Sequence, residues 1–313
     1  MESKILIRTL RKEDLGLMIE LFNFSRVKKT SFDYIKNPNY NPELVFKKKY
    51  DQKQINLLPL GTGAFLGNKL IGMCLVTYYK LKNTSKEFTV GQLGDVVIKR
   101  EFQSKGLFNK LLHAIMNEAE KLKIDGLIGF PNLNATPAFK NNHKWIHVGD
   151  FCKYEFSLKT FPILKILNKL GFYKLFYRLI KSVNKLKFKS VETKVLTVPL
   201  SKEYLDYKSY HDYRIFETQV SNILWTISDG VNVVNSTIYN EDLLKIELNE
   251  LRKYFSRRGV HKLSYIVQFE SNLSSYLSRW AVGTKTVPIF IFYINNDIKK
   301  FSIIFSGFER NHF

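Results

Sequence analysis

The segment from Gly94 to Phe108 constrains this chain most, because an apolar strand pattern runs directly into a short polar loop and then into a helix. The first turn of a helix leaves backbone N–H groups without partners and carries roughly half a positive charge. Gly106 precedes the helix and has no Cβ, so a ligand can approach the backbone closely. The pattern fits a phosphate-binding loop, and it fits an ordinary strand-loop-helix crossover equally well.

The first half of the chain predicts a mixed α/β fold. Apolar alternation and apolar runs predict strands over 4–10, 60–67, 69–80, 88–99, 126–131 and 145–157. Apolar residues at helical spacing predict helices after Asp14, over 106–122 and briefly over 135–142. The order is strand, helix, three strands, helix, strand, helix, strand. It indicates a mixed central sheet flanked by helices and excludes a doubly wound parallel sheet.

The second half repeats part of this order. Strands are predicted over 213–219, 222–228, 231–239, 262–269, 288–294 and 300–306, and helices over 241–258 and 271–281. Helix, strand, short helix and strand follow one another as they do in 106–157, which indicates a duplicated half. No Gln-x-x-Gly loop precedes the helix of the second half.

The net charge of +21 favours anionic partners. Nucleic acid, an anionic membrane surface and phosphate-bearing substrates all fit, although AT-rich coding alone would also enrich lysine. Basic and apolar residues alternate at helical spacing over 159–190, almost without acids. Such a helix packs on its own protein with a solvated basic back or, as the lesser alternative, lies on an anionic membrane.

Cysteine and histidine usage gives no sign of a metal site. Cys74 and Cys152 stand in apolar surroundings without a Cys-x-x-Cys pair, and the six histidines are scattered. We therefore expect neither a disulfide framework nor a bound metal. The N-terminal residues show no signal-peptide core, and no apolar run reaches the ~18 residues of a membrane span. The expected location is cytoplasmic, with membrane association through 159–190 as the alternative.

Two motifs carry a resemblance to a known family. Val96-Val97-Ile98 followed by Gln103-Ser104-Lys105-Gly106-Leu107-Phe108 resembles the cofactor loop of the GNAT superfamily of N-acetyltransferases, Gln/Arg-x-x-Gly-x-Gly/Ala. Phe108 departs from the last position of that loop. Downstream, the run from Gly129 to Phe139 resembles a pattern in GNAT-like proteins of bacterial surface-polysaccharide clusters. The resemblance covers residues 4–157.

The resemblance implies acetyl-CoA, or another acyl-CoA, as donor and a small amine as acceptor. The pyrophosphate would bind the backbone N–H groups of the loop, namely Gln103, Ser104, Lys105, Gly106, Leu107 and Phe108. The pantetheine arm would pair with the strand edge at Val96, Val97 and Ile98, and the strand after the helix would splay away to admit it. Asn134 would help to place the pantetheine, and Phe139 lies on the short helix beside the cofactor.

The resemblance also suggests catalytic roles. Asp95 is the candidate general base by its position, with Glu101 more distant, and the Val97 N–H is the candidate oxyanion donor. Phe139 stands where many members of the family carry a tyrosine as general acid, so a general acid is not identified. No metal takes part in this chemistry.

The sequence thus predicts three parts. Residues 1–157 form a GNAT acyl-CoA-binding domain, 158–194 a basic amphipathic connector, and 195–313 a degenerate second GNAT-like domain. The expected function is acetyl transfer to an amine, specifically an amino sugar in surface-polysaccharide biosynthesis. The alternatives are a peptidoglycan-type aminoacyltransferase that uses aminoacyl-tRNA and a non-catalytic binding protein with a relic site. We expect no specific nucleic acid partner, and the sequence does not give the oligomeric state.

Overall fold

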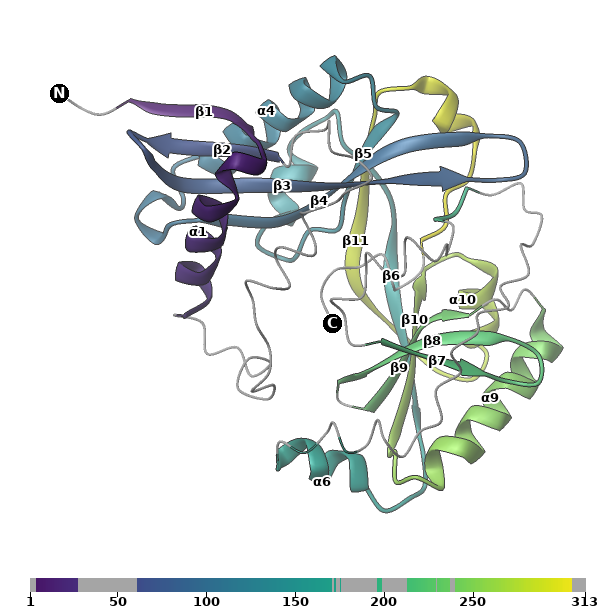
Figure 1. Cartoon of the computed structure of the whole chain (residues 1–313). Coiled ribbons are helices and arrows are strands. Elements are labelled where there is room, and N and C mark those ends of the chain that lie inside the picture. The colour runs from purple at the N-terminus through teal and green to yellow at the C-terminus, as the bar shows by residue number, and fades with distance from the viewer. Residues whose placement is uncertain are drawn as a thin grey trace. The chain divides into compact units, whose positions relative to one another are not determined.

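The computed structural model describes residues 4–27, 61–170, 172, 175, 196–198, 213–228, 230–236 and 240–305 (Figure 1). Chain contacts divide it into two compact units. Unit 1 holds Met1–Val148, Lys194–Tyr210 and Ile289–Ser302, and unit 2 holds Gly149–Thr193, His211–Pro288 and Ile303–Phe313. The sequence-based boundary after residue 157 therefore differs from the division by contacts, which falls inside a strand.

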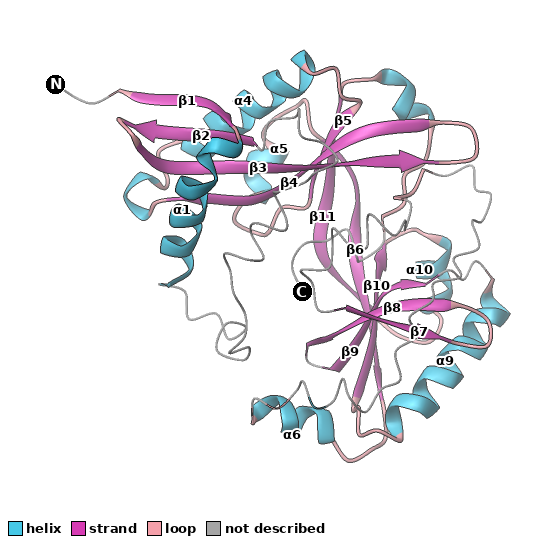
Figure 2. Ribbon diagram, in the orientation of Figure 1, coloured by secondary structure: helices cyan, strands magenta, loops and turns pink. Residues whose placement is uncertain are grey.

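Figure 2 shows the helices and strands along the chain. The first half contains β1 (Ile5–Leu10), η1 (Lys12–Asp14), α1 (Leu15–Val27), β2 (Gly61–Leu66), β3 (Lys69–Lys82), β4 (Glu87–Ile98), η3 (Arg100–Phe102), α4 (Leu107–Lys121), β5 (Gly126–Gly129), α5 (Thr136–Lys140) and β6 (Ile146–Ser157). The second half contains α6 (Ile163–Lys169), β7 (Tyr213–Glu217), β8 (Asn222–Ser228), β9 (Gly230–Ser236), α9 (Glu241–Ser256), β10 (Lys262–Gln268), α10 (Asn272–Leu277), β11 (Gly283–Tyr293) and η5 (Asn296–Lys300).

The sheet of unit 1 has the order β1-β2-β3-β4-β5-β11. Neighbours run antiparallel except β4 and β5, which are parallel and are connected by the crossover helix α4. A parallel pair requires such a crossover because a short turn cannot return the chain to the same end of the sheet. The mixed α/β layout predicted from the sequence is confirmed.

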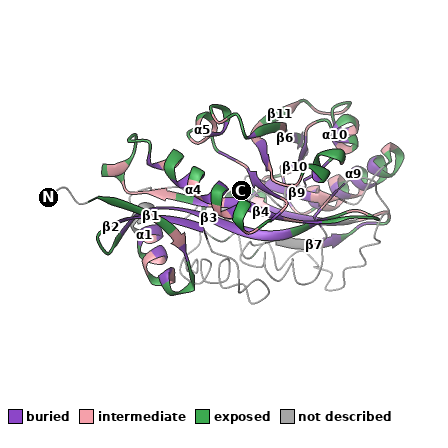
Figure 3. Cartoon of the chain, turned by 90° about the horizontal axis from the view of Figure 1, so that it is seen from above, coloured by how far each residue is buried: buried purple, intermediate pink, exposed green. Residues whose placement is uncertain are grey.

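Two helices cover opposite faces of this sheet, as Figure 1 shows for α1 and α4. Met73 and Leu75 of β3 belong to the apolar cluster under α1. Cys74 and Val76 point the other way, into the cluster under α4. This alternation follows from the period of two along a strand. Because both faces are covered, β3 is buried over most of its length (Figure 3).

Unit 2 repeats the element order of unit 1 from β2 onward. Its sheet runs β6-β10-β9-β8-β7, with β9 and β10 parallel and joined by α9. In each unit, the strand that follows the crossover helix pairs antiparallel with a strand from the other half of the sequence. Phe290–Tyr293 of β11 pair with β5, and Phe151–Ser157 of β6 pair with β10. Each half of the chain therefore completes its sheet with a strand from the other half.

Three expected strand boundaries are corrected by the structure. β5 ends at Gly129 rather than at 131, because Pro131 has no N–H to continue the ladder. β11 begins at Gly283, five residues before the expected start at 288. The strand expected over 300–306 is wrong over the described residues: Asn295 accepts a hydrogen bond from the Asp297 N–H and starts η5, and between Phe301 and Phe305 Ile303 alone forms an isolated bridge. Most of the helix expected within 159–190 lies outside the described residues.

A buried carboxyl group holds unit 2 together. Glu247 of α9 is fully buried, and its carboxyl accepts hydrogen bonds from the Tyr265 hydroxyl at 2.7 Å, the Ser236 hydroxyl at 3.0 Å and the Ser221 hydroxyl. Burial raises the pKa of Glu247 above its usual range, and the three hydroxyl donors oppose that rise. The group therefore links β8, β9 and β10 to α9 and is sensitive to pH.

We expect the free energy of unfolding to depend on this group in a defined direction. The folded chain keeps the Glu247 proton to higher pH than the unfolded chain. The stability that it contributes is thus fully present below the unfolded-state pKa of about 4.3 and is lost as pH rises toward the folded-state pKa. Urea unfolding of the wild type should lose stability over this range relative to Glu247→Gln, which carries no titrating carboxyl.

The matched control is Glu217→Gln in β7 of the same unit, because that side chain is exposed. It should leave the pH dependence of unfolding unchanged. If Glu247→Gln and the wild type show the same slope of stability against pH, the assignment of a raised pKa to Glu247 is wrong.

Candidate functional site

The strand β4 carries a bulge at the start of the segment that the sequence singled out. Leu75 of β3 faces Gly94, and Met73 faces Val97, so β4 contains one extra residue at this point. Asp95 lies in the bulge with φ of 40° and is 9% exposed. A left-handed conformation is uncommon for a residue other than glycine, and aspartate tolerates it better than most. Gly94 inside a strand pattern is the sequence signal for this bulge.

Beyond the bulge, β4 loses its neighbour on one side. The parallel pairing with β5 runs from Val90–Gly126 to Leu93–Gly129 and stops there, whereas β4 continues to Ile98 in register with β3. Among the described strands, none pairs with Gly94–Ile98 on the β5 side. An open strand edge of this kind can accept an extended ligand as an additional strand. This is the geometry that pantetheine pairing with Val96, Val97 and Ile98 requires.

The ring of Phe139 occupies the place where β5 ends. A Cβ at Gly129 would lie 2.4 Å from the ring, so only glycine fits there. Phe139 is 3% exposed and also packs against Trp145 and Phe290, with ring centroids 4.8 and 5.5 Å away. Phe108, in the first turn of α4, lies 6.2 Å from the same ring. Phe139 thus ties α5 to α4 and is buried in the core of unit 1.

The loop between β4 and α4 is closed by one side chain. The Gln103 side-chain amide donates to the Ile98 carbonyl at 2.8 Å, and the Gln103 backbone N–H donates to the Arg100 carbonyl at 3.2 Å. Ser104 follows with φ of 60°. The backbone N–H of Gln103 is therefore already engaged, and the loop donors that remain begin at Ser104.

The start of α4 has the features of an anion site. Gly106 has φ of 71° and ψ of 8°, and no side chain caps the helix. The first intrahelical donor is Lys110, whose N–H bonds to the Gly106 carbonyl, so the N–H groups of Leu107, Phe108 and Asn109 precede the helical ladder. Asn109 was missed in the sequence analysis, although the rule that a helix leaves its first N–H groups unpaired would have included it.

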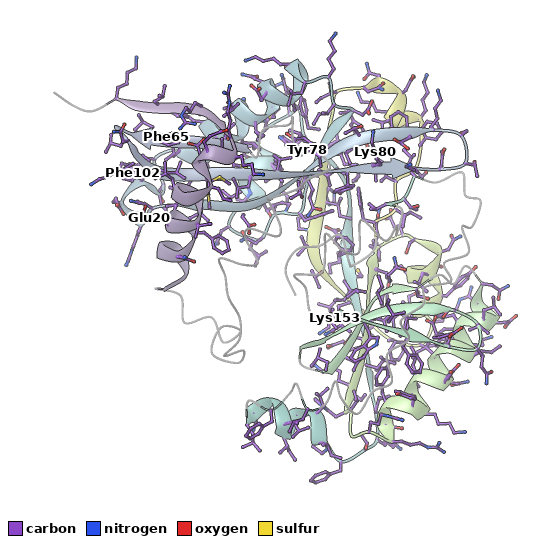
Figure 4. All side chains as sticks on the ribbon, viewed as in Figure 1. Glu20, Phe65, Tyr78, Lys80, Phe102 and Lys153 are labelled. Carbon is purple, nitrogen blue, oxygen red and sulfur yellow. The ribbon has the colours of Figure 1, made fainter. Side chains whose placement is uncertain are left out.

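The charge around this helix start favours an anion. Residues 99–110 contain the bases Lys99, Arg100, Lys105 and Lys110 and the single acid Glu101. The Lys105 ammonium lies 5.7 Å from the centre of the Phe102 ring. Figure 4 labels Phe102 at the end of the sheet away from Lys80.

The equivalent helix of unit 2 is built differently. The Asn240 side chain caps α9 by accepting from the N–H groups of Asp242 and Leu243, and Glu241 and Asp242 lie in the first turn. These groups satisfy the positive helix end internally and would repel an anion. Of the two crossover helices, only α4 offers free donors in a basic surrounding.

The remaining predicted residue, Asn134, is exposed in the turn before α5. That turn is held by Asn132, whose side chain and carbonyl both accept from the Ala135 N–H, at 3.0 and 3.1 Å. The structure thus brings the segment from Asp95 to Phe108 and the ring of Phe139 together. It leaves Asn134 as a surface residue available to a ligand.

Other kinds of site were also sought in the described residues. They contain no group of three or more His, Cys, Asp or Glu side chains placed to hold a metal. Cys74 and Cys152 are free and buried, and burial raises the pKa of the Cys74 thiol to about 12. None of the described helices is both long enough and apolar enough to cross a membrane.

Comparisons with known proteins identify the fold. No protein-family model and no curated protein matches the sequence. Among solved structures, a conserved protein of Enterococcus faecalis V583 described as a probable N-acyltransferase matches 94% of this chain and 73% of its own, with a TM-score of 0.62 and 13% identity. A GCN5-related N-acetyltransferase from Kribbella flavida matches 94% of this chain and 72% of its own, with a TM-score of 0.58 and 8% identity. Another from Anabaena variabilis matches 93% of this chain and 73% of its own, with a TM-score of 0.59 and 10% identity.

The fold is that of the GCN5-related N-acetyltransferases. The GNAT fold expected from the sequence is therefore confirmed, and it extends beyond residues 4–157, since the matches cover 93% or more of the chain. At these identities the likeness concerns the fold alone. The likeness does not identify the donor, the acceptor or the roles of individual residues.

A matched pair of substitutions at Gly106 tests the loop as a pyrophosphate site. Both Gly106→Gln and Gly106→Glu must adopt the left-handed conformation at the same cost, and a Cβ there meets nothing within 4 Å, so both should fold. Only the glutamate adds a negative charge at the helix start. Calorimetric titration should show that Gly106→Glu binds acetyl-CoA at least about tenfold more weakly than Gly106→Gln, because the added carboxylate repels the pyrophosphate. Equal affinities of the two variants would show that the pyrophosphate binds elsewhere.

Proposed function

We propose that this protein is an acyl-CoA-dependent N-acyltransferase that uses acetyl-CoA and acts on an amino sugar of bacterial surface polysaccharide. One observation carries the proposal. The continuous segment from Gly94 to Asn109 combines a strand bulge, an open strand edge and an uncapped basic helix start. These three features match the three parts of an acyl-CoA in order: the thioester, the pantetheine arm and the pyrophosphate.

In this proposal the donor binds mainly through the backbone. The N–H groups from Ser104 to Asn109 bind the pyrophosphate, and Lys105 adds charge beside it. The pantetheine amides pair with β4 at Val96, Val97 and Ile98, beyond the end of its pairing with β5. Val96 is 40% exposed in the structure and is thus accessible to the ligand. Asn134 approaches the pantetheine from the turn before α5.

The reaction requires one acyl transfer and the loss of two protons from the acceptor ammonium. Asp95 accepts a proton from the acceptor ammonium, and the amine lone pair then attacks the thioester carbonyl to form the new C–N bond. The Val97 N–H stabilises the oxyanion. The C–S bond breaks and coenzyme A leaves as a thiolate. The nitrogen of the new amide gives its second proton to water, and the thiolate takes a proton from water, because Phe139 offers no hydroxyl. Positioning of the two reactants accounts for most of the acceleration.

The acceptor class is the least direct part of the proposal. It rests on the resemblance of Gly129–Phe139 to proteins of surface-polysaccharide clusters. The net charge of +21 also fits an acceptor that carries phosphate, such as a nucleotide-linked or lipid-linked amino sugar. The same charge supports the second candidate, an aminoacyltransferase that uses aminoacyl-tRNA. The helix start at α4 favours the CoA donor, because its uncapped N–H groups and basic neighbours suit a pyrophosphate.

Ligand binding distinguishes these candidates. Acetyl-CoA at saturating concentration should raise the Tm of the folded protein, because a ligand that binds only the native state stabilises it by mass action. Retention on a CoA resin should exceed retention on immobilised tRNA at physiological salt. No shift of Tm at millimolar acetyl-CoA would overturn the donor assignment. Retention on tRNA alone would favour the aminoacyltransferase, and acetyl-CoA binding without turnover of any amine would favour a binding protein.

Asp95→Asn tests the general base. Asparagine tolerates the left-handed conformation of the bulge, so the backbone should be retained. We expect kcat to fall by about 10²-fold or more while the affinity for acetyl-CoA stays the same, and the loss should diminish at high pH, where the amine is deprotonated in solution. Glu101→Gln is the matched control, since Glu101 is exposed in η3. If Glu101→Gln loses activity and Asp95→Asn keeps it, the base has been assigned to the wrong carboxylate.

A further inference from the structure

The short helix α6 is fixed on unit 2 by one face. Leu164 is fully buried in the unit 2 core, and Leu167 packs against the same cluster. The Leu164 N–H donates to the Gly259 carbonyl at 3.1 Å, and the Thr160 hydroxyl donates to the Ser256 carbonyl at 2.7 Å. A Cβ at Gly259 would meet Ile163 at 2.4 Å, so helix and turn are in close contact. The helix therefore already uses an apolar face for packing on its own protein.

A second apolar face of the same segment remains exposed. Six large apolar side chains, each between 40% and 70% exposed, form what we call the α6 patch: Phe161, Ile163, Ile166, Leu170, Phe172 and Leu175. Ile163, Ile166 and Leu170 recur at the spacing of one helix face. Single exposed apolar residues need no explanation, but six large ones within fifteen residues of one segment indicate an interaction surface.

The sequence around the patch carries bases and no acid. Lys159, Lys165 and Lys169 are exposed beside it. Between Glu155 and Glu192 the sequence contains no Asp or Glu, and it contains nine bases, namely Lys159, Lys165, Lys169, Lys174, Arg178, Lys181, Lys185, Lys187 and Lys189. A second copy of this chain would bring the same positive charge against the patch, which disfavours self-association.

We propose that the α6 patch docks on an anionic lipid bilayer. The apolar side chains enter the boundary between headgroups and acyl chains, and the lysines extend their stems along the apolar surface so that each ammonium reaches a lipid phosphate. Both properties of the segment are then used at once: apolar burial provides the insertion and the lysines select anionic lipid. The proposal concerns unit 2 and does not depend on acyl transfer by unit 1.

Vesicle co-sedimentation of the full chain tests the docking. Wild type should bind vesicles made of equal parts phosphatidylcholine and phosphatidylglycerol, bind pure phosphatidylcholine far more weakly, and dissociate as salt rises. The pair Lys165→Gln and Lys169→Gln should lower the partition coefficient by about thirtyfold, since each lysine near such a surface contributes about fivefold. The pair Ile166→Ser and Leu170→Ser should lower it at least as much, and circular dichroism would confirm that both variants fold.

The matched control lies on α9 of the same unit. Leu243 and Ile246 are about as exposed as Ile163 and Ile166, so Lys245→Gln with Ile246→Ser removes one charge and one apolar residue from a surface outside the patch. It should bind vesicles like the wild type. The proposal fails if the folded wild type does not bind anionic vesicles, or if the control and patch variants lose binding equally. It also fails if sedimentation shows a dimer that only the Ile166→Ser and Leu170→Ser variant dissociates.

Discussion

β5 pairs with β4 over four residues and then ends. The candidate site depends on the continuation of β4, which stays paired with β3 but has an open edge on the β5 side. Pro131 cannot extend the ladder, and the Phe139 ring fills the space that a side chain at Gly129 would need. The bulge at Asp95 lies just past the last paired residue. The open edge, the strained aspartate and the first turn of α4 are thus placed by one local interruption of the sheet.

The two crossover helices occupy the same place in a repeated element order but begin in different ways. α4 begins at a left-handed glycine with no cap and basic neighbours, whereas α9 begins at a capping asparagine followed by two acids. The first leaves a positive helix end available to an anion, and the second neutralises it within the helix. α9 instead contributes the buried carboxyl of Glu247 to the core of unit 2. In our proposal the helix with the open end binds the donor, whereas the capped helix contributes to the core of unit 2.

The exchange of β6 and β11 explains why the sequence and the contacts divide the chain differently. Composition and element order place a boundary near residue 157, but β6 pairs with β10 and β11 with β5. Pairing across halves of the sequence depends on which strand edge is free after folding, and the local pattern of a strand does not encode its partner. The late start expected for β11 has a similar cause, because Gly283–Pro288 read Gly-Thr-Lys-Thr-Val-Pro, a stretch without the apolar alternation of a strand.

The sequence by itself determined the mixed α/β class, the position of most helices and strands, and the loop from Gln103 to Phe108 as the place to look for a phosphate. Hydrophobic periodicity and turn residues act over a few positions, so they can be read along the chain. Only the tertiary structure decided that the Gln103 backbone N–H donates to the Arg100 carbonyl, that Phe139 is a core residue beside Gly129, and that Asp95 lies in a bulge. These facts depend on register and packing between residues far apart in the sequence, which local patterns do not carry.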